Sequence, residues 1–82
     1  FTHDGAHPRR YSVDINNLCW SEIVVRLIQA GVGTAVSYIN DNGEAITNPA
    51  HDTIVKSKAL IIMVDADRMP SEQLITHALE AC

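Results

Sequence analysis

The feature that most constrains the fold is a run of six apolar residues at positions 59–64, Ala-Leu-Ile-Ile-Met-Val. A strand with one wet face alternates apolar and polar residues, whereas a run that is apolar at every position predicts a strand covered on both faces. The run is far shorter than the roughly 20 residues needed to cross a bilayer. We therefore expect residues 59–64 to form the central strand of a mostly parallel sheet that lies between helices.

The residues before this run predict a strand, a helix and a second strand. Residues 11–15 alternate between apolar and polar side chains, which is the period of a strand. Asn16 and Asn17 are suited to cap the helix that follows, whose apolar residues recur at helical spacing until Gly31 supplies a stop. Residues 34–39 are rich in β-branched and aromatic side chains and predict the second strand.

Turn-forming and helix-starting residues divide the rest of the chain. The sequence Asn-Asp-Asn-Gly at positions 40–43 predicts a turn. An Asn-Pro pair at positions 48–49 predicts a short turn or helix that runs to Lys58, and Pro70 opens a last helix that runs to Cys82.

The element order is therefore βαβαβα. This order predicts an α/β fold of three layers, flavodoxin-like, with a small, mostly parallel sheet and right-handed crossovers. Residues 1–10 show no period and are expected to form a flexible lead-in, and residues 11–82 a single domain. Because both ends of the chain look like cuts made in a longer polypeptide, we expect the domain to be part of a larger protein.

Composition argues against several classes of function. Ten acidic against six basic residues give a net charge of −4, which disfavours a broad binding surface for nucleic acid or for an anionic membrane. No basic-then-apolar leader opens the sequence, so we expect a cytoplasmic location. Cys19 and Cys82 both fall in apolar helical patterns, and we expect both to be free thiols.

Polar side chains follow the predicted strands at one edge of the predicted sheet. Asn16 and Asn17 follow the first strand, and Asp65 and Asp67 follow the central one. In a parallel sheet, ligands bind beyond the carboxyl ends of the strands, so these four side chains are a candidate pocket. The same residues can also be explained without a ligand. The asparagines then cap a helix, and the aspartates are polar residues that end a buried strand.

The segment from the apolar run to Pro70 resembles the receiver domains of two-component signalling. In those domains a buried strand delivers a phosphoacceptor aspartate and a Met-Pro pair follows, as Asp65, Asp67 and the pair Met69 and Pro70 follow here. The sequence Asn-Gly-Glu-Ala at positions 42–45 is also similar to a stretch that many receivers carry after the second strand.

Departures from the receiver pattern bear on activity. Asn16 and Asn17 stand where a receiver has the acidic pair that holds Mg²⁺, and Ala66 stands at the usual acceptor position. The resemblance therefore implies a degenerate pseudo-receiver of the kind found in bacterial hybrid sensor histidine kinases. Such a module binds or positions a neighbouring domain or a response regulator, without catalysis or cofactor. The alternative is an active receiver, phosphorylated on Asp65 or Asp67 with Mg²⁺.

Cys19 carries a second, weaker resemblance, to the sugar-phosphotransferase IIB domains. Those domains have a phosphorylated cysteine just after the first strand, and some have an apolar strand that ends in Ala-Asp, like Ala66 and Asp67. Their cysteine is followed by a glycine-containing loop that cradles phosphate, whereas Trp20 and Ser21 follow Cys19 within the predicted helix. Phosphotransfer on Cys19 is thus the alternative to a buried structural cysteine.

The remaining candidates point to contacts with a protein partner. Trp20, Arg68 and Met69 are candidate interaction residues, with a place in the core as the other interpretation of Trp20. His3 and His7 can bind Cu²⁺ or Ni²⁺ only if the chain begins at its true amino terminus. The sequence contains no catalytic triad, phosphate-binding loop, dinucleotide motif or zinc spacing, so we expect a domain that is not an enzyme.

Overall fold

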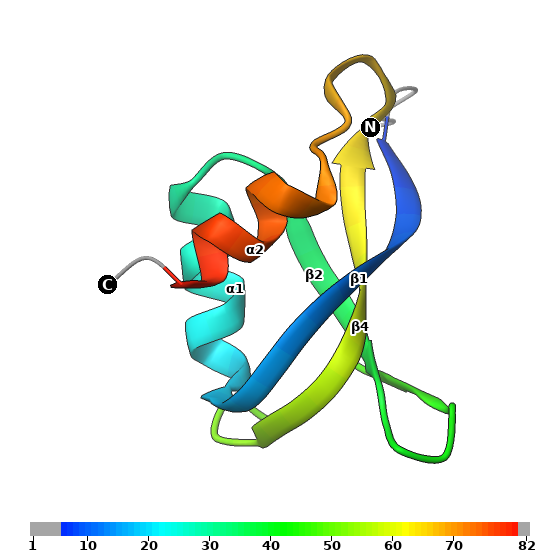
Figure 1. Ribbon diagram of the computed structural model, residues 1–82, viewed down its shortest axis with the longest axis vertical. Coiled ribbons are helices and arrows are strands. Elements are labelled where there is room, and N and C mark those ends of the chain that lie inside the picture. The colour runs from blue at the N-terminus through cyan, green and yellow to red at the C-terminus, as the bar shows by residue number, and fades with distance from the viewer. Residues whose placement is uncertain (1–5, 81–82) are drawn as a thin grey trace.

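The computed structural model describes residues 6–80, which form one sheet and two α-helices (Figure 1). Along the chain the elements are β1 (Ala6–Cys19), α1 (Trp20–Gln29), β2 (Thr34–Ile39), β3 (Ala45–Thr47), β4 (Ile54–Asp65), a 3-10 turn (Ala66–Arg68) and α2 (Glu72–Glu80). The strands lie in the order β1-β4-β2-β3, and every neighbouring pair is antiparallel. Both helices cover the same face of the sheet. Within residues 6–80, neither helix has the length and apolar character of a membrane span.

The prediction of a mostly parallel, flavodoxin-like βαβαβα fold is wrong, because β4 runs antiparallel to both of its neighbours. A parallel arrangement needs a crossover helix before this strand. The segment expected to form that helix, residues 48–58, contains instead a loop and the first part of β4. Its strand pattern is hard to read because Ser57 is buried while Ile54 is 60% exposed, so polarity does not follow burial there.

The apolar run at residues 59–64 belongs to an interior strand, as predicted, but helices cover only one of its faces. Leu60, Ile62 and Val64 point toward the helices and are at most 2% exposed. Ile61 and Met63 alternate with them on the other face and are partly exposed. The uncovered face of this strand is therefore apolar as well, which is why its sequence resembles a strand of a parallel sheet.

β1 begins well before the predicted strand. Residues 6–10, expected to form a flexible lead-in, pair with residues 61–65 of β4. All of them except Ala6 are exposed, so this part of the strand lacks the apolar alternation by which a strand is predicted.

Two bulges interrupt β1 farther along. The register with β4 shifts between Ser12 and Ile15 and again between Asn16 and Leu18. Asn17, at the second shift, has a φ of 59°, a left-handed conformation that asparagine tolerates better than most residues. Asn16 and Asn17 therefore lie within the strand, and the prediction that they cap the helix is wrong.

α1 is the predicted helix, and a distant loop satisfies its first turn. The backbone N–H groups of Trp20 and Ser21 donate to the carbonyl oxygens of Thr53 and His51, at 2.8 and 3.0 Å. No side chain caps this helix. The loop before β4 thus replaces the side-chain cap and joins the start of α1 to the start of β4.

The core lies between the sheet and the two helices. Trp20 is 3% exposed, and its ring centroid lies 6.1 Å from that of Tyr38 on β2. The largest side chains that are fully buried come from both helices and from β4, and they are Ile23, Leu27, Leu60, Ile62, Ile75, Val55 and Val64. Trp20 had two interpretations, an interaction residue or a core residue, and in the structure it is a core residue.

Two hydrogen bonds hold the start of α2 against β1. The Tyr11 hydroxyl donates to the Pro70 carbonyl oxygen at 2.9 Å in a buried environment. The backbone N–H of Ser12 donates to the Glu72 carboxylate, also at 2.9 Å. The position of α2 on the sheet is therefore fixed at its amino-terminal end by polar contacts as well as by its apolar stripe.

Gly33 brings the chain into close contact with β4. A Cβ at this position would lie 2.7 Å from the Met63 carbonyl oxygen and 2.8 Å from Cγ2 of Ile62. The φ of Gly33 is +152°, which side chains rarely adopt. Glycine is required here because a backbone carbonyl of the neighbouring strand occupies the space of a side chain.

We expect Gly33→Ala to lower the free energy of unfolding by about 3 kcal/mol, since it adds a clash with β4 to the backbone strain. Gly43→Ala is the matched control, because Gly43 has a φ of +82° with nothing within 4 Å of its Cβ position. This control should lose only about 1 kcal/mol. Urea denaturation measures both values, and equal losses would contradict the close approach.

We expect Tyr11→Phe to lower the free energy of unfolding by about 1–2 kcal/mol, because the buried Pro70 carbonyl loses its donor. Tyr38→Phe is the control, since within residues 6–80 the Tyr38 hydroxyl makes no hydrogen bond. It should change stability by less than about 0.5 kcal/mol. Hydrogen exchange should also show faster opening of α2 in Tyr11→Phe, and unchanged exchange in α2 would argue against the tether.

Candidate functional site

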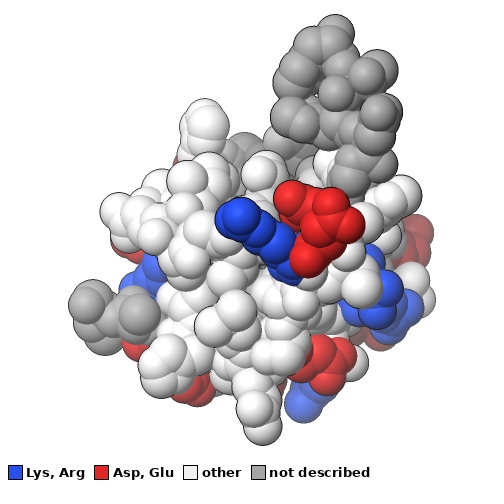
Figure 2. Space-filling view, turned by 90° about the horizontal axis from the view of Figure 1, so that it is seen from above, with Lys and Arg blue, Asp and Glu red and all other residues white. Residues whose placement is uncertain are grey.

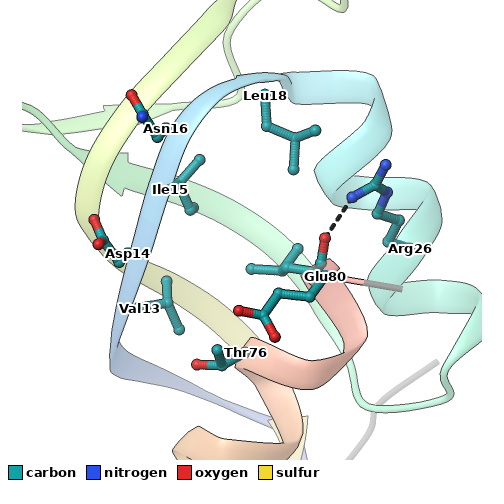
Figure 3. Close-up of a pocket in the computed structure, with 9 residues that line it drawn as sticks. Val13, Asp14, Ile15, Asn16, Leu18, Arg26, Thr76 and Glu80 are labelled. Carbon is teal, nitrogen blue, oxygen red and sulfur yellow. Dashed lines mark hydrogen bonds between the residues drawn. The ribbon is translucent and has the colours of Figure 1, made fainter. Parts of the chain in front are cut away.

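The bulged part of β1, residues 13–18, sends side chains to both faces of the sheet. Val13, Ile15 and Leu18 point into the space in front of α1 and α2, whereas Asp14 and Asn16 point away from it (Figure 3). A hollow lies on each side of this segment. We call them the inner hollow, between β1 and the helices, and the outer groove, on the face without helices.

The inner hollow has a volume of about 250 Å³ and a largely apolar floor. Its polar residues come from the helices, with Arg26 on α1 and Thr76 and Glu80 on α2 (Figure 3). The floor is formed by Val13, Ile15, Leu18 and Leu79. This space continues the core toward the surface.

Arg26 connects the two helices at the edge of the inner hollow. Its guanidinium forms an ion pair with Glu22, with 3.5 Å between Nε and the carboxylate oxygen. It also donates a hydrogen bond to the Leu79 carbonyl oxygen in the last turn of α2 (Figure 3). A cation is favoured there because the carboxyl end of a helix carries partial negative charge. The contacts of Arg26 thus hold α1 and α2 together.

The outer groove consists of two adjoining parts, of about 210 and 500 Å³, which share Asp41 and Lys58. The smaller part lies at the bulged end of β1 and the larger part lies across β1, β4 and the turn after β2. The side chains that line the groove are mostly polar, and they include Arg10, Ser12, Asp14, Asn16, Ile39, Asn40, Asp41, Lys56 and Lys58.

Three basic side chains face the outer groove without an acidic partner. Arg10, Lys56 and Lys58 are exposed, and within residues 6–80 none of them forms an ion pair. In the larger part of the groove, Arg10 and Lys58 outnumber the single carboxylate of Asp41. The larger part therefore carries a local positive charge on a chain whose net charge is −4.

Ser57, which lines the smaller part of this groove, links β4 to the end of β2. Its hydroxyl donates toward the carbonyl oxygens of Ile39 and Ala59, 2.6 and 2.8 Å away, and accepts from the N–H of Ala59 at 3.1 Å. Ser57 is 4% exposed, so these bonds are shielded from water. The bond to Ile39 holds the end of β2 against β4, next to the exposed Lys58.

The turn that borders the groove is built as its sequence predicts. Asn40 Oδ1 accepts hydrogen bonds from the N–H groups of Asn42 and Glu44, both at 2.9 Å. Gly43 has a φ of 82°, and its N–H donates to the Asn40 carbonyl at 3.0 Å. The turn sequence is thus explained by local geometry, and the turn places Asp41 on the wall of the groove.

The four residues of the predicted strand-end pocket do not come together. Asn16 pairs with Lys56 near the start of β4, whereas Asp65 is the last residue of that strand. The nine steps along the strand from Lys56 to Asp65 extend over about 30 Å. Because β1 and β4 are antiparallel, their carboxyl ends lie at opposite ends of the sheet. Asn16 and Asn17 are therefore far from Asp65 and Asp67.

Asp65 has a local role at its own end of the sheet. Its Oδ1 accepts the N–H of Asp67 at 2.9 Å and so caps the 3-10 turn. Both aspartates are exposed. They therefore end a buried strand and begin a loop, as the simpler interpretation of their sequence predicts.

Cys19 precedes α1, but backbone groups already occupy the start of that helix. The Cys19 thiol donates to the His51 carbonyl oxygen at 3.6 Å, and Trp20 and Ser21 use their N–H groups for the same loop. A phosphate cradle needs such N–H groups turned toward the anion. Cys19 is a free thiol, as predicted, while Cys82 lies outside the described residues.

The other predicted residues are scattered over the surface. Arg68 and Met69 lie exposed in the segment between β4 and α2, at the end of the molecule seen in Figure 2. Basic and acidic side chains lie next to one another on this end and form no patch of one sign. His7 is exposed on β1, and His3 lies outside the described residues. Within residues 6–80, no three His, Cys, Asp or Glu side chains group as a metal site.

Patterns in the sequence do not reveal the basic residues of the outer groove. The burial of the side chains alternates here, with Val55 and Ser57 buried and Lys56 and Lys58 exposed. Because Ser57 is polar as well, hydropathy does not show this alternation, and the segment does not have the pattern of a strand with one wet face. The sequence predicts Arg10 in the flexible lead-in, which gives no reason to expect it beside the groove.

The chain was compared with family models, with curated proteins and with solved structures, and none of the three comparisons gave a match.

Proposed function

We propose that this domain is a non-catalytic protein-interaction module, which binds an extended segment of a partner protein or of a neighbouring domain in the outer groove. The observation that carries the proposal is the groove itself, which lies on the face that the helices leave uncovered. Its larger part has a volume of about 500 Å³ and can accept side chains of a bound segment.

The composition of this face matches that of protein interfaces. Ile61 and Met63 alternate with the core residues of β4 and are partly exposed, and Ile39 lines the larger part of the groove. Arg10, which lines the same part of the groove, pairs with Ile61. An apolar centre within a polar rim is the common arrangement of interfaces between proteins.

The proposal keeps part of what the receiver resemblance implies. A role in binding another domain agrees with a non-catalytic module, whereas membership of a two-component pathway stays a prediction. The strand-end aspartates are not part of the proposal, because they are far from Asn16 and Asn17 along the sheet. A cytoplasmic location is part of the proposal, and the free thiol of Cys19 supports it because reducing compartments keep thiols free.

The test is selection of binding peptides from a random library displayed on phage, with the full chain as bait. We expect Ser12→Trp to abolish binding of the selected peptides, because the exposed Ser12 side chain lines the groove and a Trp side chain fills it. Gln73→Trp, on the exposed side of α2, is the matched control and should leave binding unchanged.

Circular dichroism should show that both variants fold like the original chain. Selected peptides that bind the original chain and Ser12→Trp equally would contradict the groove as the binding site. A library that yields no binding peptide after repeated selection would contradict the interaction function.

A further inference from the structure

We infer that the segment bound in the outer groove is acidic, an inference that rests on the proposed function. Arg10, Lys56 and Lys58 face the groove, and none of them forms an ion pair within residues 6–80. They are half of the six basic residues of a chain whose net charge is −4. A negatively charged ligand complements these three cations and is steered toward them.

The register of the sheet gives the length of this ligand. Arg10 stands beside Ile61, and Lys58 and Lys56 lie farther back along β4. At about 3.3 Å per residue the three cations span roughly 15 Å. An extended peptide covers that distance with about five residues. The ligand is therefore a short extended segment with several acidic side chains.

Two carboxylates that line the groove provide an internal control for the charge of the ligand. Asp41 and Lys58 line both parts of the groove, and Asp14 lines the smaller part. Both repel an acidic ligand, so removal of the Asp41 charge should strengthen binding, whereas removal of a cation should weaken it. A general loss of folding cannot produce effects of opposite sign at neighbouring positions.

The position of the aromatic residues favours a peptide over single-stranded nucleic acid. Proteins that bind single strands stack bases on aromatic side chains in a basic groove. Within residues 6–80, Tyr11 and Trp20 are buried in the core and Tyr38 packs against Trp20. The groove therefore has charge for a phosphate backbone but no platform for its bases.

The test is an amide NMR titration of the full chain with a blocked peptide of alternating Glu and Ser residues. This peptide should cause saturable shifts at Arg10, Asp41 and Lys58. The double variant Arg10→Gln with Lys58→Gln should weaken its affinity about tenfold, and Asp41→Asn should strengthen it about twofold. Arg68→Gln removes an exposed cation that does not line the groove, so it should leave the affinity unchanged.

A second peptide, with Gln in place of Glu, separates this inference from the proposed function. If it binds in the groove as tightly as the Glu peptide, the acidic class is wrong and the interaction function stands. The acidic class is also wrong if groove-binding peptides from the phage library are not acidic, or if the double variant binds the Glu peptide normally. Tighter binding of oligouridine than of the Glu peptide at the same amides would overturn both proposals in favour of nucleic acid.

Discussion

The backbone hydrogen bonds of β4 hold together parts of the chain that are far apart in sequence. β4 pairs with β1 over almost its whole length and with β2 over its second half, so β1 and β2 run parallel to each other without touching. α1, the helix that joins β1 to β2, crosses over β4, which is the last strand in the sequence. The core is complete only when β4 is in place, because β4 supplies Leu60, Ile62 and Val64 beneath the helices.

Local patterns in the sequence predicted local structure, but the direction of β4 depends on contacts that local patterns do not contain. The stripe of α1, the turn at residues 40–43 and the interior position of residues 59–64 all agree with the structure. The parallel sheet was wrong because the alternation before residue 59 is broken by Ser57, which is polar yet buried through its bonds to Ile39 and Ala59. A buried hydroxyl with backbone partners leaves no signal in hydropathy.

The candidate site was less predictable than the fold for a related reason. The strand-end pocket was inferred from a rule for parallel sheets, and an antiparallel partner separates its members. The groove lies beside a bulge, where the register of β1 with β4 shifts between Ser12 and Ile15, and its basic residues come from two strands that only the register places side by side. Bulges leave little trace in composition, so the gathering of Arg10, Lys56 and Lys58 is visible only once the register is known.

The hydrogen bond between Ser12 and Glu72 also bears on how copies of this protein meet. β1 lies at the edge of the sheet, and N–H groups that point outward from such an edge invite another strand to join. The Glu72 carboxylate occupies the outward donor of Ser12, and the bulges that follow break the straight line that an incoming strand needs. Edge-to-edge growth into aggregates is thereby opposed along the middle of β1, while the uncovered face of the sheet stays accessible.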